Sequence, residues 1–230
     1  MQIEFIPSIN EDLLPPIPAV QQLPNWYKSM SPHIKGKVDS FKYDNINSTI
    51  KRCNPVGDAF NTGYFLVLEN AISVTKLEDG KQEMHWGRGG KDLVTTHSQE
   101  QIHLDLVPTG FSKVAWKFRN YYGIKTPKGY STLFTHPLNR PELPFFTLQG
   151  VVDTDTYHNP VNFPFFLKKD FEGIIPAGTP IVQVIPLKRE KWNKFVSGPN
   201  LVMMEKFQIS HDRYKNRWYK NFFWNRKEYK

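Results

Sequence analysis

Short apolar segments separated by turn-forming residues cover most of this 230-residue chain. From Thr49 to Pro186, runs of a few apolar residues are bounded by Pro, Gly, Asn or Asp. Residues 101–107 (QIHLDLV) alternate apolar and polar side chains, the period of a half-buried strand. The dipeptide Asp79-Gly80 tolerates the positive φ angles of a tight turn and predicts a hairpin. Since no helical period intervenes, the pattern predicts a sandwich or barrel-like all-β domain.

The two ends of the chain have different patterns. Residues 1–40 begin with the candidate strand QIEFI and continue through a proline-rich stretch, which favours an extended arm over a helix. In residues 206–230, Tyr214, Trp218 and Phe222 recur four residues apart among basic residues, which predicts an amphipathic helix. The predicted organisation is therefore an N-terminal arm, an all-β domain and a C-terminal basic aromatic helix, at residues 1–40, 41–205 and 206–230.

Composition supports a folded, mainly β protein with an uneven charge. Eighteen prolines argue against a mainly helical chain, and an aromatic content of 14% provides apolar area to bury. The net charge is +8, of which residues 206–230 contribute +6 through eight basic and two acidic residues. Residues 1–205 are thus close to neutral at +2. An acidic partner would therefore be recognised by the C-terminal segment.

The chain lacks the signals of secretion and membrane insertion. Cys53 is the single cysteine, so an internal disulfide is excluded and a reducing compartment is expected. The N-terminus has neither the basic nor the apolar part of a signal peptide. No apolar run approaches the roughly 18 residues of a membrane span. We therefore expect a protein made in the cytoplasm, with no membrane span.

Three motifs in the middle of the chain carry a family resemblance. They read PKGYS at 127–131, GVVDTDTY at 150–157 and IPAGTPIVQVIP at 175–186. In order and spacing they resemble the dUTPase and dCTP-deaminase group. The resemblance implies a β-clip fold, often trimeric, in which Asp153 faces the sugar of a bound nucleotide and a water. It also implies that the backbone of the first motif approaches phosphates.

The same motifs depart from that family at several positions. Lys128 stands where the family has a phosphate-binding Arg, Gly129 and Tyr130 intrude before Ser131, and Tyr157 falls one residue late. The glycine-rich C-terminal motif of the family and its early A-G-x-D segment are absent. These differences preserve the expectation of a β-clip architecture and argue against diphosphatase activity.

A second resemblance covers most of the chain. The N-terminal arm ending in P-x-W-Y-K-x-M and the segments 51–59, 126–140 and 175–192 resemble a family of proteins encoded by tailed phages, including cyanophages. This resemblance implies a viral origin and no particular chemistry.

Asp153 and Asp155 are the leading candidates for a site. Two residues apart on an extended or turning segment, they would face the same side, where paired carboxylates raise each other's pKa or gather a cation. The alternative is that Asp155 and its neighbours only shape a turn. His136 and His158 could add imidazole ligands, but no metal-binding spacing is present, so we predict no metal site.

The remaining candidate site residues would bind a small anionic ligand opposite the Asp153 turn. Lys128 and Arg140 would supply positive charge, although exposed bases more often serve solubility. The full predicted set of ligand-binding residues is Lys128, Ser131, Arg140, Asp155, Tyr157 and His158.

For the C-terminal segment three interpretations stay open. Aromatic rings interleaved with basic residues can stack on the bases and pair with the phosphates of single strands. They can also lie on a membrane surface. An aromatic stripe at helical spacing most often packs on protein, either the domain or a neighbouring subunit.

The leading functional prediction is a phage-type accessory or virion-associated protein with a non-catalytic binding or assembly role, which also holds a small anionic ligand. We expect a homo-oligomer, for which a trimer fits, and a phage or host protein partner, in the cytoplasm of the infected cell or in the virion. One alternative is a nucleotide hydrolase with Asp153 as general base, with Mg²⁺ as cofactor in that case only. The other is nucleic-acid binding through residues 206–230.

Overall fold

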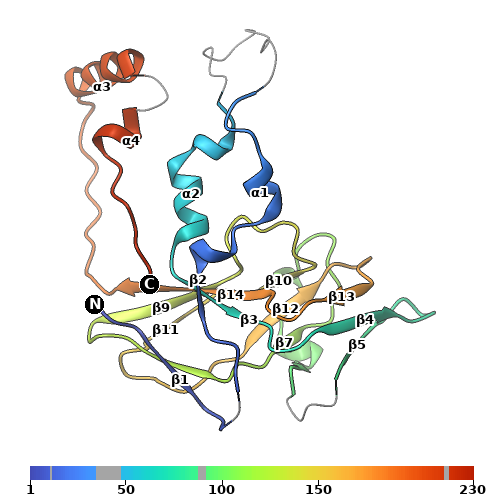
Figure 1. Cartoon of the computed structure of the whole chain (residues 1–230). Coiled ribbons are helices and arrows are strands. Elements are labelled where there is room, and N and C mark those ends of the chain that lie inside the picture. Colours follow the sequence, from blue (N-terminus) through green and yellow to red (C-terminus); the bar gives the residue numbers. More distant parts are fainter. Residues whose placement is uncertain (11, 35–47, 88–91, 215–217) are drawn as a thin grey trace.

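The computed structural model describes residues 1–10, 12–34, 48–87, 92–214 and 218–230. Figure 1 shows a body of β-sheets, a helical layer above it, and a C-terminal segment that rises beside this layer and returns to the body. The longer helices are α1 (Asn25–Ser29), α2 (Asn54–Asn61), α3 (Leu201–Tyr214) and α4 (Trp218–Phe222). Short 3₁₀ helices are η1 (Ala19–Gln22), η2 (Ile50–Arg52), η3 (Gln99–Gln101) and η4 (Leu104–Leu106). The predicted mainly β class, with an N-terminal arm and a C-terminal helix, is confirmed.

The strands of the described residues form four antiparallel sheets. The five-stranded sheet has the order β11 (Gly150–Val152), β9 (Tyr130–Thr135), β14 (Pro180–Lys188), β3 (Tyr64–Val67) and β2 (Ile17–Pro18). The four-stranded sheet has the order β10 (Phe145–Thr147), β12 (Phe163–Leu167), β7 (Trp116–Phe118) and β6 (Val94–Thr96). The smaller sheets are β13 (Gly173–Ile175), β4 (Ile72–Lys76) and β5 (Gln82–Trp86), and β1 (Glu4–Pro7) with β8 (Tyr122–Lys125).

Both faces of the five-stranded sheet are covered. Along β3, Leu66 joins the main core, whereas Phe65 and Val67 pack with Ala19 in a second, smaller cluster. β14 accordingly has six consecutive buried residues at its start. Such a continuous run is typical of a strand that is covered on both sides.

The main core is formed by buried residues of all four sheets, and it is rich in phenylalanine. The rings of Phe118 and Phe165 stack with centroids 3.7 Å apart, and Phe145 meets both rings edge-on. Aromatic side chains bury large areas and favour such offset or edge-on contacts. Five of the seventeen phenylalanines of the sequence are buried in this core.

The buried amide of Gln183 joins the helical layer to β14. Its Oε1 accepts a hydrogen bond from the Leu138 N–H (2.8 Å), and its Nε2 donates to the carbonyls of Ala59 (3.0 Å) and Thr62 (2.5 Å). Gln183 is fully buried. Three backbone groups at the end of α2 and after β9 therefore depend on one side chain for their hydrogen bonds.

Local sequence signals were right at turns and wrong at one strand. The predicted hairpin at Asp79-Gly80 is confirmed, with Gly80 at φ 79° between β4 and β5. The period-two segment 101–107 is not a strand. It contains the end of η3 and all of η4, because side chains of Gln101 and His103 bond to nearby backbone N–H groups and stabilise tight turns.

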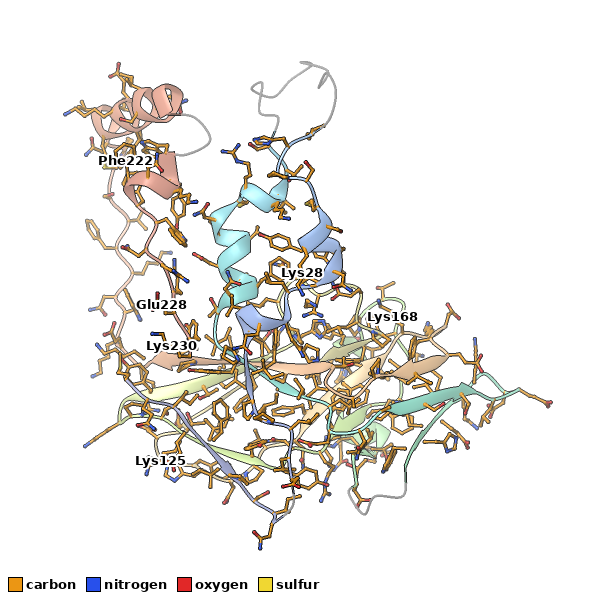
Figure 2. All side chains as sticks on the ribbon, viewed as in Figure 1. Lys28, Lys125, Lys168, Phe222, Glu228 and Lys230 are labelled. Atoms are coloured by element: carbon orange, nitrogen blue, oxygen red, sulfur yellow. The ribbon has the colours of Figure 1, made fainter. Side chains whose placement is uncertain are left out.

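The C-terminal segment departs from the predicted continuous helix over 206–230. The chain leaves the sheet at the end of β14, and α3 begins at Leu201. After α4 the chain becomes extended and runs back to the sheet, where Glu228 and Lys230 lie beside its edge in Figure 2. None of the helices in the described residues has the length and apolar character of a membrane span.

Candidate functional site at the acidic corner

The turn after β11 lies against the turn before β9. The two strands pair antiparallel, with Val152 opposite Thr132. Thr154, only 2% exposed, bonds through its hydroxyl to the hydroxyls of Thr126 and Thr132, both at 2.8 Å. These buried threonines hold the two turns together, and Asp153 and Asp155 are the residues before and after Thr154 in the chain.

Five residues converge here, and we call them the acidic corner: Gly129, Ser131, Asp153, Asp155 and Arg189. The Ser131 hydroxyl donates to Asp153 Oδ1 at 2.7 Å, and the Gly129 N–H donates to Asp155 Oδ2 at 2.8 Å. Arg189 Nη1 donates to Asp153 Oδ1 at 3.1 Å and to Asp155 Oδ1 at 2.9 Å, while its Nη2 pairs with Asp155 Oδ2. The guanidinium therefore bridges both carboxylates.

The two carboxylates differ in burial and in charge stabilisation. The Asp155 side chain is 3% exposed, whereas that of Asp153 is 64% exposed. Hydrogen bonds from Arg189 and then from the Gly129 N–H lower the pKa of Asp155 from 3.8 to about 2. Because this pKa is lowered on folding, the pair adds stability above about pH 3.8, and the contribution is lost as the pH falls through about 2.

The structure brings together three of the residues predicted from the sequence, namely Ser131, Asp153 and Asp155. Lys128 is exposed on the neighbouring turn and has no hydrogen bond or ion pair within the described residues. Tyr157 is 48% exposed and bonds to the Asp153 carbonyl through its backbone N–H. His158 is also exposed. A Cβ at residue 123 would lie 2.0 Å from the His158 carbonyl oxygen, so this position requires glycine.

Arg140 does not contribute to the acidic corner. Its side chain is 10% exposed and pairs through Nε with Glu142, while its Nη1 donates to the Gln22 carbonyl at 2.9 Å. The Trp26 indole donates to the other oxygen of Glu142 at 3.1 Å. Arg140 therefore connects the loop after β9 with the helical layer.

The sequence did not predict two residues of the acidic corner, Gly129 and Arg189, and Arg189 is the charged one. It follows the last residue of β14, and its backbone N–H donates to the Gly129 carbonyl at 2.8 Å. The one signal in the sequence was a basic run, Lys188-Arg189, at the end of an apolar strand. Nothing local indicates which acidic residues such a base will meet.

The acidic corner as it stands is an internal ion pair. Arg189 and Ser131 both donate to Asp153 Oδ1, and among the described residues no hydrogen bond to Asp153 Oδ2 is found. Among the described residues, no group of three His, Cys, Asp or Glu side chains could hold a metal ion. The acidic corner therefore fixes the point where the chain leaves β14.

A groove of about 410 Å³ lies on the other side of the 127–131 turn. It is lined by Thr126, Pro127 and Tyr130 together with residues from both termini, among them Tyr229 and Lys227. Lys227 is the basic side chain among these lining residues, and its Nζ pairs with Asp58 at 2.7 Å. The turn that the resemblance placed near phosphates is thus adjacent to the returning C-terminus.

Comparisons with known proteins show similarity to phage dUTPase structures. No protein-family model matches the chain, and no curated protein matches it. A mutant dUTPase from phage phi11 of S. aureus is 10% identical over 74% of this chain and 92% of that chain, with a TM-score of 0.31. A mutant dUTPase of Staphylococcus bacteriophage 80alpha with dUpNHpp is 14% identical over 56% and 88%, with a TM-score of 0.27. At these values the likeness carries no argument about activity.

Proposed function

We propose that this chain is a non-catalytic assembly protein of phage type whose C-terminal arm, residues 190–223, docks on a second copy of the chain. The observation that carries the proposal is an arm fixed at both ends with large apolar side chains exposed between them. The acidic corner supports the same role, because its carboxylates are engaged within the chain in holding the arm.

The first end of the arm is fixed by the acidic corner and the second by Asp58 and Tyr64. Asp58 accepts a hydrogen bond from the Trp224 indole at 2.9 Å and pairs with Lys227. The Tyr64 hydroxyl donates to the Lys230 carbonyl at 3.2 Å, and its ring meets that of Tyr229 edge-on at 5.7 Å. An arm held in place before binding loses less conformational entropy when it docks.

The middle of the arm exposes a large apolar surface. Trp192 is 85% exposed and Phe195 is 87% exposed, which is unusual for aromatic residues with no role in binding. The other exposed apolar residues of the arm are Val196, Leu201, Val202, Met203, Met204, Phe207, Ile209, Tyr219, Phe222 and Phe223. Aromatic residues and Met are enriched at protein interfaces, so this composition favours a protein partner.

Ring contacts within the arm favour protein docking over binding of single strands. Phe207, Trp218 and Phe223 pack on one another, with centroid distances of 5.7 Å, 6.3 Å and 4.7 Å. Rings that already contact one another offer fewer free faces for stacking on bases. A second copy is the simplest partner, because closed symmetry lets each chain give and receive one arm, as in a trimer. The proposed location is the virion or the cytoplasm of an infected cell.

The test is the oligomeric state of the full chain. We expect the wild type to sediment as an oligomer and the double variant Trp192→Ser, Phe195→Ser to sediment mainly as a monomer, because burial of both rings drives association. Sedimentation velocity over a concentration series measures this. The matched control is Val151→Ser, Ile174→Ser, which removes two apolar side chains exposed on the body (61% and 67%). A monomeric wild type, or equal loss of association in the control, would contradict the proposal.

A non-catalytic role also predicts no response to nucleotides. Thermal unfolding with a panel of deoxynucleoside triphosphates and Mg²⁺ should give an unchanged midpoint, and no pyrophosphate or phosphate should be released. The reasons are that no group of three His, Cys, Asp or Glu side chains among the described residues could hold Mg²⁺, and that Arg189 and Ser131 both donate to Asp153 Oδ1. Mg²⁺-dependent hydrolysis that disappears in Asp153→Asn would instead establish the hydrolase alternative.

A further inference from the structure

An apolar cavity of about 640 Å³ lies between the helical layer and the loop before β10. Aromatic walls come from Trp26, Phe111, Phe145 and Phe146, and aliphatic side chains of η2 and α2 complete one side. The charged side chains among its lining residues are Arg140 and Lys168, both cations. Cavities of this size, mostly apolar with a few polar groups, are typical small-molecule sites.

Lys168 supplies an unneutralised charge at this cavity. Its Nζ donates to the Pro141 carbonyl at 2.7 Å, and within the described residues it has no carboxylate partner. An ammonium has three donors, so two remain for a ligand. In Figure 2, Lys168 lies where the helical layer meets the sheet body, on the side away from the C-terminal arm.

Arg140 lines the same cavity and adds further donors. Glu142 and the Gln22 carbonyl engage its Nε and Nη1, and of the five N–H donors of a guanidinium those of Nη2 have no partner among the described residues. Glu142 offsets one of the two positive charges, which leaves a net charge of +1 for Arg140, Glu142 and Lys168 together.

We propose that this cavity binds an amphipathic monocarboxylate, such as a medium-chain fatty acid, with its carboxylate at Lys168 and Arg140 and its alkyl chain among the aromatic walls. Apolar walls favour an apolar body through the hydrophobic effect, and a cation without a carboxylate partner favours an anionic head. A nucleotide fits less well, because the polar edges of its base would be buried against walls that offer few partners.

His136 keeps the inner wall uncharged and thereby favours an apolar body there. Burial lowers the pKa of His136 from 6.5 to about 4. Its Nδ1 accepts from the Thr147 N–H at 3.3 Å, and its Nε2 lies 3.4 Å from the Arg140 carbonyl, so both nitrogens have backbone partners. The ring packs against Phe146 with centroids 5.2 Å apart.

The test compares decanoate with decanol by isothermal titration calorimetry on the full chain. We expect decanoate to bind with one site per chain and more tightly than decanol. Lys168→Met should weaken decanoate at least tenfold and leave decanol unchanged, because only the charge is removed. Lys169→Met, next in sequence with an exposed side chain that does not line the cavity, is the matched control and should change neither affinity.

A second variant separates binding in the cavity from binding elsewhere. Val56→Trp places a large ring in the cavity lining and should weaken both decanoate and decanol. Equal binding of decanoate by Lys168→Met and wild type, or unchanged binding by Val56→Trp, would overturn the proposal. Binding that occurs only in Trp192→Ser, Phe195→Ser would also overturn it, since the cavity would then be a docking site for the arm of a second copy.

Discussion

Gly63→Ala is expected to prevent stable folding of this chain. Gly63 connects α2 to β3 with φ 74°, and a Cβ there would lie 2.1 Å from the carbonyl oxygen of Val184. That oxygen belongs to β14, where Val184 pairs with Tyr64, so it cannot move without breaking the central sheet. The left-handed φ alone costs about 1–2 kcal/mol. With the steric overlap, we expect a loss above about 4 kcal/mol, or insoluble protein.

Gly80→Ala separates the two causes of this loss. Gly80 has nearly the same φ, 79°, but no atom lies within 4 Å of its Cβ position. Its substitution should therefore lower the free energy of unfolding by only about 1 kcal/mol, the cost of the φ angle. Urea unfolding followed by circular dichroism measures both variants. Equal losses of unfolding free energy in Gly63→Ala and Gly80→Ala would show that β14 does not lie as close to Gly63 as described.

Gln183→Met is expected to give the second-largest loss of stability. Met preserves length and volume but removes all three hydrogen bonds of the buried amide. The Leu138 N–H and the carbonyls of Ala59 and Thr62 would then lose this partner. An unsatisfied buried group costs about 1–3 kcal/mol, so we expect a total near 4 kcal/mol.

Two further variants sharpen this prediction. Gln149→Met makes the same chemical change at an exposed position and should change the free energy of unfolding by less than about 0.5 kcal/mol. Gln183→Glu keeps an acceptor for Leu138 but places a carboxylate against two carbonyls, so it should be no more stable than Gln183→Met. A loss below about 1 kcal/mol in Gln183→Met would mean that the amide does not hold α2 to β14.

The sequence predicted those parts of the fold that depend on neighbours along the chain. The Asp79-Gly80 hairpin follows from a backbone preference of two residues, and the buried run of β14 follows from the apolar side chains on both sides of Gln183. The same local reasoning was wrong at 101–107. There the alternation is real, but side-chain hydrogen bonds from Gln101 and His103 stabilise 3₁₀ turns instead.

The candidate site was predictable only in part. Asp153, Asp155 and Ser131 were selected from short motifs, and the structure brings them together. The residues near Asp155 in sequence do not show whether the three side chains form an open cleft. That depends on Arg189, which is 34 residues from Asp155 in sequence. Arg140 was assigned to the same ligand, yet its buried guanidinium lies with Glu142 and Gln22. The viral origin, the oligomeric state and the ligand stay predictions.

By itself the sequence determined the class of this protein: many short strands, a proline-rich start and an apolar, basic end. Backbone preferences and side-chain burial act over a few residues, so they can be read from the order of the amino acids. Only the tertiary structure decided that Arg189 closes the acidic corner, that the C-terminus returns to Asp58, and that Lys168, which has no carboxylate partner in the described part of the chain, meets an apolar cavity. Such contacts join distant segments, and their charges and hydrogen bonds acquire partners only when the sheets have packed.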